Sequence, residues 1–166
     1  VVEPAGRGAP ALTVVFVHGY ALDSGTFHFQ RKALTGLTAP RLRLVAYDQP
    51  GHGRSGRLPS GEYSIDALGG ALWRVLEEVA PDGPLALVGH SMGGMTIMAL
   101  AAQRPDLCRA GGRVAGGLLT NSPSGLLSRM TLGFPEVVAK PARNSIIKTL
   151  RKIAAKPGRA DAVRAK

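Results

Sequence analysis

A single serine stands between two glycines near the middle of the chain, in the G-x-S-x-G pattern from Gly89 to Gly93. A short apolar run at residues 85–88 precedes this pattern, and an apolar, helix-like run from residue 92 to about residue 104 follows it. A serine on such a sharp strand-to-helix turn has a strained backbone, which small neighbours tolerate, and its hydroxyl projects above the sheet. The pattern therefore predicts a catalytic nucleophile at Ser91, with a packing turn as the alternative.

The elements that must position this serine alternate along the chain. Short apolar runs bounded by polar or turn residues predict strands at residues 11–17, 42–47, 85–88 and 114–120. Helical spacing and capping residues predict helices at residues 23–36, 64–79 and 92–104. Alternation over more than 100 residues indicates βαβ units. The predicted fold class is therefore α/β, a mostly parallel sheet with helices on both faces.

The starts of two helices are predicted from capping residues. Asp23 or Ser24 should cap the first helix, and Ser64 should cap the second. The residues expected to form the inward-facing stripe of the first helix are Phe27, Ala33, Leu34 and Leu37.

Polar clusters follow three of the predicted strands. They are the sequence His18-Gly19-Tyr20, Asp48 with the loop after it, and the serine turn. In an open parallel sheet, functional groups gather at the carboxyl ends of the strands. The shared placement of these clusters is stronger evidence for a site than any one of them alone.

Three stretches in this order resemble the α/β-hydrolase superfamily: VHGY at residues 17–20, DQPGHGRSG at 48–56 and VGHSMGG at 88–94. The resemblance covers roughly residues 1–125 and is specific to the superfamily, not to one activity within it. It implies that Ser91 is the nucleophile, and that the backbone N–H groups of Tyr20 and Met92 form an oxyanion hole.

The resemblance also implies structural roles beside the site. The histidine at position 18 would orient the loop that carries Tyr20, although a general-base role is its rival interpretation. Asp48 and His52 would shape their loop. The rival interpretation is that His52 is a general base and that Asp48 is the acid that orients it. The residues that the resemblance makes structural near the site are His18, Gly19, Gly89, His90 and Gly93.

The sequence departs from the superfamily pattern where the catalytic base should be. In this fold the triad follows the chain order Ser, then Asp or Glu, then His. All four histidines precede Ser91, and the acids after it are only Asp106, Glu136 and Asp161. A serine hydroxyl is a weak nucleophile without an adjacent base.

The simplest account of the missing base is that the chain is the N-terminal portion of a longer hydrolase, with the C-terminal strands absent. Residues 1–124 would then be the first part of the core, and residues 125–166 the start of a lid or cap, basic and helical. Val1-Val2 would be the end of an earlier strand. The intact protein would be an esterase- or lipase-like enzyme, and this chain alone would be inactive. The alternative is a non-catalytic half-fold or interaction protein.

The net charge of +10 is concentrated at one end, because residues 139–166 contain nine Lys or Arg residues and a single Asp. Within this segment Ile146, Ile147, Leu150 and Ile153 fall on one face of a predicted helix. A basic amphipathic helix can bind a membrane surface or a phosphate backbone. The favoured interpretation is a helix that packs on protein outside this chain.

Composition sets the remaining expectations. A length of 166 residues with 45% hydrophobic and 19% charged residues suits one globular domain. The single cysteine, Cys108, excludes an internal disulfide and a metal site built on cysteines. We expect a cytoplasmic protein with no cofactor or metal, no nucleic-acid partner and no membrane span, acting on a small acyl or ester substrate.

Overall fold

The computed structural model describes residues 1–3, 9–37, 39–61 and 63–122. The chain divides into two units, Val1–Ser124 and Gly125–Lys166, and every described residue lies in the first. The predicted lid segment at 125–166 and its basic helix therefore lie outside the described residues.

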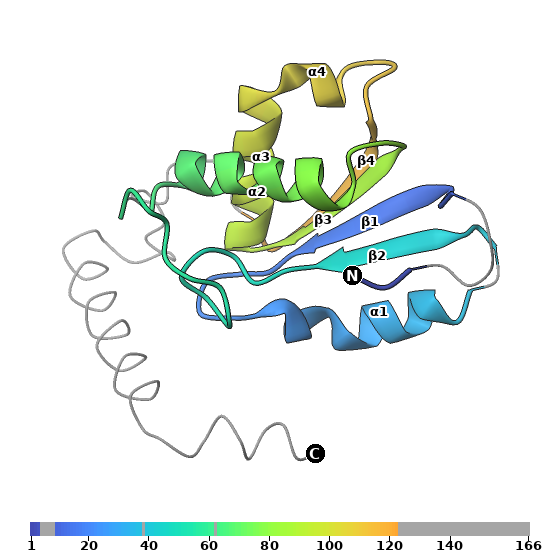
Figure 1. Ribbon diagram of the computed structural model, residues 1–166, viewed down its shortest axis with the longest axis horizontal. Helices are drawn as coiled ribbons and strands as arrows, with labels where there is room; N and C mark the ends of the chain where they lie inside the picture. Colours follow the sequence, from blue (N-terminus) through green and yellow to red (C-terminus); the bar gives the residue numbers. More distant parts are fainter. Residues whose placement is uncertain (4–8, 38, 62, 123–166) are drawn as a thin grey trace, which may run out of the picture. The chain divides into compact units, whose positions relative to one another are not determined.

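Four parallel strands form the sheet, in the order β2-β1-β3-β4 (Figure 1). Their bounds are Leu12–Val17 for β1, Leu42–Ala46 for β2, Leu85–His90 for β3 and Val114–Thr120 for β4. All four predicted strands are thus confirmed, and the third runs two residues further than expected. Val2 adds an antiparallel bridge to Leu44 on the outer side of β2.

Helices cover both faces of the sheet, as predicted. On one face lie α2 (Ile65–Val79) and α3 (Met92–Gln103), and on the other lie η1 (Ser24–Phe27) and α1 (His28–Thr35) (Figure 1). A short helix, α4 (Pro105–Cys108), follows α3 and was not predicted. Its first residue is Pro105, directly after the predicted end of the preceding helix at residue 104.

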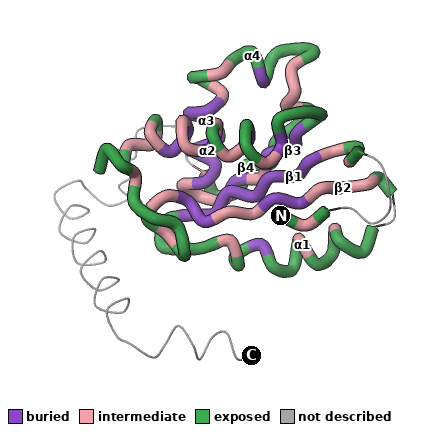
Figure 2. The backbone as a smooth tube through the Cα atoms, viewed as in Figure 1, coloured by how far each residue is buried: buried purple, intermediate pink, exposed green. Residues whose placement is uncertain are grey.

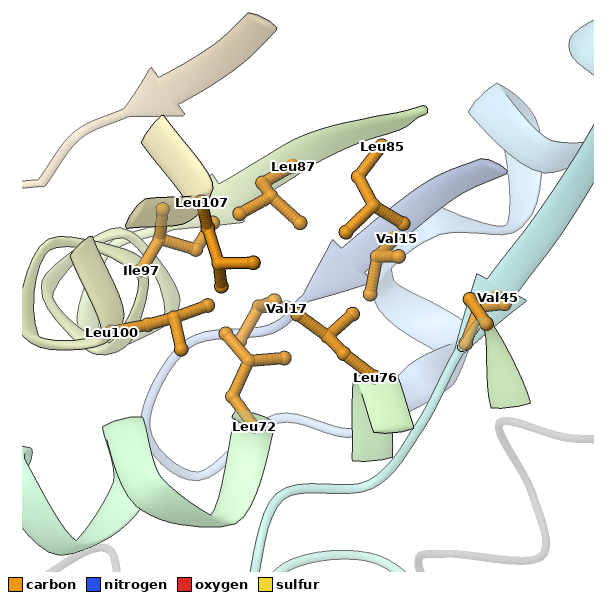
Figure 3. Packing of buried hydrophobic residues seen from close by; sticks show 11 residues of the cluster. Val15, Val17, Val45, Leu72, Leu76, Leu85, Leu87, Ile97, Leu100 and Leu107 are labelled. Atoms are coloured by element: carbon orange, nitrogen blue, oxygen red, sulfur yellow. The ribbon is translucent and has the colours of Figure 1, made fainter. Parts of the chain in front are cut away.

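Successive residues of β1 enter different hydrophobic cores, because side chains alternate across a strand. Val15 and Val17 pack in the core under α2 and α3, which Figure 3 shows together with Leu72 and Leu100. Val14 and Phe16 pack instead in a smaller core with Phe27. The alternation explains why the β1 sequence carries no charged residue.

The caps formed largely as expected. Asp23 caps η1 by accepting a hydrogen bond from the Gly25 N–H at 2.7 Å. The Ser64 hydroxyl accepts from the Ala67 N–H at 3.1 Å at the start of α2. The expected inner stripe of the first helix was partly wrong, because Ala33 and Leu37 are exposed. Leu34 does pack in the core with Phe27, whereas Leu37 lies beyond the end of α1 at Thr35.

The outer strand β4 is less covered than the rest of the sheet. Six of its seven residues are exposed, including Leu118 and Leu119. By contrast, the β1 strand two positions inward is almost entirely buried (Figure 2). The expected burial of the sheet on both faces therefore holds for β1 and fails for β4, whereas the other edge strand, β2, still buries Leu44 and Val45.

Candidate active site

The ends of the strands bring the predicted polar clusters to one edge of the sheet. Phe16 pairs with Ala46, and Val17 pairs with Gly89, so β1, β2 and β3 end at similar levels. The chain moves from β1 outward to β2, then returns to the other side of β1 to form β3. Ligands bind preferentially at such a switch point in a parallel sheet. Ser91, directly after β3, lies at this point.

The Ser91 backbone has the strain that the sequence pattern predicts. Its φ is 52° and its ψ is −118°, a conformation that residues with a side chain rarely adopt. Neighbouring backbone groups fix the turn: the Ser91 N–H donates to the Thr120 carbonyl at 2.9 Å, and the Gly94 N–H donates to the Ser91 carbonyl at 3.0 Å. The Ser91 side chain makes no capping hydrogen bond to α3. Such strain accumulates at functional sites.

Close backbone approaches explain the glycines around Ser91. A Cβ on Gly89 would lie 2.6 Å from the Gly94 nitrogen, and a Cβ on Gly93 would overlap the Val17 carbonyl oxygen. A Cβ on Gly19 would lie 3.3 Å from the Ser91 Cβ. The start of α3 is therefore packed directly on the end of β1, and the loop after β1 lies against the serine.

The backbone N–H groups of Tyr20 and Met92 have no backbone acceptor among the described residues. Met92 is the first residue of α3, so its N–H has no partner within the helix. The helix N-terminus also carries a partial positive charge. These amides belong to the two segments that meet at Gly19, where they could stabilise an anion.

His18 is completely buried, and both of its ring nitrogens have backbone partners. Its Nε2 accepts from the Gln49 N–H at 2.9 Å, so Nδ1 carries the proton and donates to the Gly19 carbonyl at 2.8 Å. Burial lowers the pKa of His18, with the charge of His52 adding to the effect against opposing contributions from the Gly19 carbonyl and Asp48. A neutral ring with no free nitrogen holds the loop and is not available to accept a proton from Ser91.

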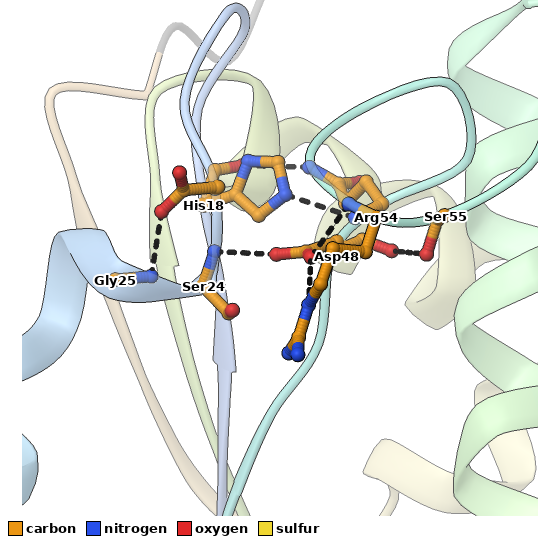
Figure 4. Close-up of polar contacts among 8 residues, drawn as sticks. His18, Ser24, Gly25, Asp48, Arg54 and Ser55 are labelled. Carbon is orange, nitrogen blue, oxygen red and sulfur yellow. Dashed lines mark hydrogen bonds and ion pairs between the residues drawn. The ribbon is translucent and has the colours of Figure 1, made fainter. Parts of the chain in front are cut away.

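Asp48 organises the loop after β2. Its carboxylate accepts from the Ser24 N–H at 2.7 Å and from the Arg54 N–H at 3.0 Å, and Figure 4 shows both bonds. Burial alone would raise the pKa of Asp48, but these hydrogen bonds outweigh burial and lower it to about 2. The carboxylate also explains Gly53, whose φ is 52° and whose Cβ would collide with it.

Lowering the pH should reduce the folding stability of the protein, because Asp48 becomes protonated. Because its pKa in the folded state is about 2, below the ordinary 3.8, ionised Asp48 contributes stability above about pH 4. This contribution disappears as the pH falls toward about 2. We expect the stability advantage of the natural protein over Asp48→Asn to shrink by about 2 kcal/mol between about pH 5 and about pH 2. Urea unfolding of both proteins measures this difference, and a constant difference across that range would contradict the assignment.

No histidine is hydrogen-bonded to the Ser91 hydroxyl, although all four histidines lie in the described part of the chain. His52 bonds the Pro50 carbonyl through Nδ1 at 3.1 Å, and its ring centroid lies 5.6 Å from that of Tyr20. The buried Nδ1 of His90 has no partner and faces Gly19. His28 is exposed on α1. The structure thus brings the loop after β1 and the start of α3 together at Ser91, with none of the four histidines hydrogen-bonded to the Ser91 hydroxyl.

Two buried polar residues beside the site were missed by the sequence analysis: Gln49 and Thr96. Thr96 is the one polar side chain in the apolar run from Met92 to Ala102 of α3, and that contrast was the available signal. No sequence feature marked Gln49 as a buried residue apart from its place directly after Asp48, because a sequence does not show which loop side chains turn inward.

Two cavities on the described surface lie away from Ser91. A cavity of about 620 Å³ lies near the amino ends of the strands, beside Arg43 and Gly83, at the end of the sheet away from Ser91. A second, of about 360 Å³, lies between the Asp48 loop and α2. In the described ranges, no three His, Cys, Asp or Glu side chains are grouped to hold a metal ion.

The helices of the described residues are all too short or too polar to cross a lipid bilayer.

Known proteins match this chain over most of its length. The family model described as alpha/beta hydrolase fold matches residues 13–136. The chain is 40% identical over 100 residues to Esterase Rv0045c of Mycobacterium tuberculosis, covering 60% of this chain and 31% of that protein. It is 37% identical over 105 residues to Lipase LipV of the same organism, covering 63% of this chain and 37% of the lipase.

A solved structure has the same arrangement of strands and helices. The structure of Est816, described as an N-acyl homoserine lactone degrading enzyme, matches with a TM-score of 0.62 and 27% identity. The match covers 86% of this chain and 48% of Est816. The chain thus spans less than half of the length of each of these three proteins.

Proposed function

Because the chain belongs to the α/β-hydrolase fold family, we propose that it carries the nucleophile of a serine hydrolase that cleaves esters or related acyl bonds. Its relatives include an esterase and a lipase, which support hydrolase chemistry. The observation that carries the proposal is the strained backbone of Ser91, between β3 and α3 and beside Gly19. A packing turn would not require this conformation at a residue with a hydroxyl.

The proposed reaction proceeds through an acyl-enzyme. Ser91 Oγ attacks the carbonyl carbon of the ester and loses its proton to a base, and the carbonyl oxygen becomes an oxyanion. The N–H groups of Tyr20 and Met92 stabilise this oxyanion, each contributing about 3 kcal/mol. The C–O bond then breaks, the leaving alcohol takes the proton, and water hydrolyses the acyl group from Ser91 in a second step.

The base in this mechanism is proposed to come from sequence that this chain does not contain. His18 has both ring nitrogens occupied, and no histidine follows Ser91 in the 166 residues. The superfamily order places the acid and the histidine after the serine. The proteins compared above extend well beyond the matched region, so they have room for such groups.

Labelling with a fluorophosphonate probe tests the proposal, because the probe reacts covalently with an activated serine. In the longer protein that the proposal implies, the label should map to the peptide containing Ser91. The Ser91→Ala variant should remain unlabelled. Label on another serine, or equal labelling of the natural protein and the variant, would contradict the assignment.

The second candidate is a non-catalytic member of the family that kept the strained turn and lost the base. The observation that favours it is that none of the four described histidines is hydrogen-bonded to the Ser91 hydroxyl. Failure of the longer, folded protein to react with the probe, combined with normal stability, would support this candidate over the hydrolase.

A further inference from the structure

We propose that Gln49 is a positioning residue that fixes the loop after β1 against the first turn of α3, and thereby sets the spacing between the Tyr20 and Met92 amides. This role rests on the hydrolase function proposed above. Gln49 lies on the loop after β2, and its side-chain hydrogen bonds go to His18 and Thr96. It would act through the two segments that it joins.

The side-chain amide of Gln49 forms a bridge between these segments. Its Nε2 donates to the His18 carbonyl at 2.6 Å, and its Oε1 accepts from the Thr96 hydroxyl at 3.0 Å. The opposite orientation of the amide would place two oxygens together at His18, so only this one satisfies both groups. One planar group therefore joins the end of β1 to α3.

The backbone of Gln49 adds a second contact to the same loop. Its N–H donates to Nε2 of His18 at 2.9 Å, and the ring then donates from Nδ1 to the Gly19 carbonyl at 2.8 Å. Gln49 thus contacts the carbonyl and the ring of His18, two residues before Tyr20. Both contacts limit rotation of the peptide groups that aim the Tyr20 N–H.

Thr96 completes the connection on the helix side. Its hydroxyl lies 3.0 Å from the Met92 carbonyl as well as 3.0 Å from Gln49 Oε1. The hydroxyl has one proton, which these two acceptors share. His18, Gln49 and Thr96 are all fully buried, so water cannot replace the hydrogen bonds between them.

The proposed consequence concerns the rate of the chemical step. Oxyanion donors act when they lie about 2.7–3.1 Å from the charged oxygen. A displacement of about 1 Å can reduce a rate about 100-fold. Loss of the bridge should therefore lower kcat by about 10- to 100-fold, while KM changes by less than about 3-fold.

Isosteric variants of the longer protein test this role. Thr96→Val removes the hydroxyl that donates to Gln49, and Thr96→Ser restores it in the conservative form. Thr13→Val is the matched control. Thr13 is a buried threonine like Thr96, but it lies near the start of β1, at the end of the strand away from His18. Gln49→Met removes both side-chain hydrogen bonds at similar volume. The measurements are kcat, KM, urea unfolding, and hydrogen exchange at the Tyr20 and Met92 amides.

The proposal expects lower kcat and faster exchange at both amides in Thr96→Val and Gln49→Met. It expects recovery in Thr96→Ser and no change in Thr13→Val. Unchanged kcat and exchange in folded Thr96→Val would overturn it, even if Gln49→Met does not fold. Equal losses in Thr96→Val and Thr13→Val would also overturn it. If Ser91→Ala keeps its activity, the proposed function fails instead, and amide exchange still decides whether Gln49 positions the two segments.

Discussion

Replacing Ser91 with alanine in the longer protein is expected to reduce kcat by about 10⁶-fold, the loss measured when a serine nucleophile is removed. The reason is that the acyl-enzyme cannot form without the Ser91 oxygen, so only binding and the two amides remain to assist hydrolysis. Steady-state hydrolysis of a chromogenic ester series measures the effect. The variant should remain folded, because the Ser91 side chain makes no capping hydrogen bond to α3.

Ser122 provides the matched control for this experiment. Its hydroxyl is also close to the start of α3, since a Cβ on Gly94 would overlap it, and it donates to the Thr120 carbonyl at 3.1 Å. We expect Ser122→Ala to change kcat by less than about 3-fold, because this hydroxyl has no part in the proposed mechanism. A loss in Ser122→Ala comparable to that in Ser91→Ala would show that the nucleophile is wrongly assigned.

The chain of 166 residues alone should show no turnover of the same esters, because it lacks a base for Ser91.

Replacing Gly93 with alanine is expected to destabilise the protein by about 3 kcal/mol, near the upper end of the usual cost of overpacking. The added Cβ would occupy the position of the Val17 carbonyl oxygen, so either α3 or the end of β1 must move. Neither can move freely, because β1 lies between two strands and its last residue is fully buried. Chemical unfolding with circular dichroism detection measures the loss.

Gly116→Ala is the corresponding control, because Gly116 lies in β4 and a Cβ there would meet nothing within 4 Å. Its stability should stay within about 1 kcal/mol of the natural protein, on the stabilising side, since alanine restricts the unfolded chain more than glycine. Similar destabilisation by both variants would mean that the contact between α3 and β1 is not what requires glycine at position 93.

Much of the fold could be predicted from sequence because its signals are local. The strand at Leu12–Val17 is a short, β-branched run without charge, and the Ser64 cap precedes a clear helical period. The strained turn at Ser91 was also predictable, because the glycines that permit it lie two residues away on either side. Patterns of this kind report the backbone conformation of the segment in which they occur.

Other features depend on which parts of the chain meet, and sequence did not indicate them. The exposure of β4 could not be predicted from its apolar sequence, which resembles that of a buried strand, because exposure depends on which other parts of the chain cover the strand. Similarly, Leu37 is apolar yet exposed, and it lies beyond the end of α1 at Thr35.

The candidate site itself divides in the same way. Residue type and order predicted the strained turn at Ser91 and show that no histidine follows it within the 166 residues, and the family resemblance pointed to the two candidate amides. The protonation of His18 and the inward turn of Gln49 toward Thr96 became visible only in the folded structure. Those contacts join residues 31 and 47 positions apart, and hydrogen bonds over such separations exist only after the strands and helices have packed together.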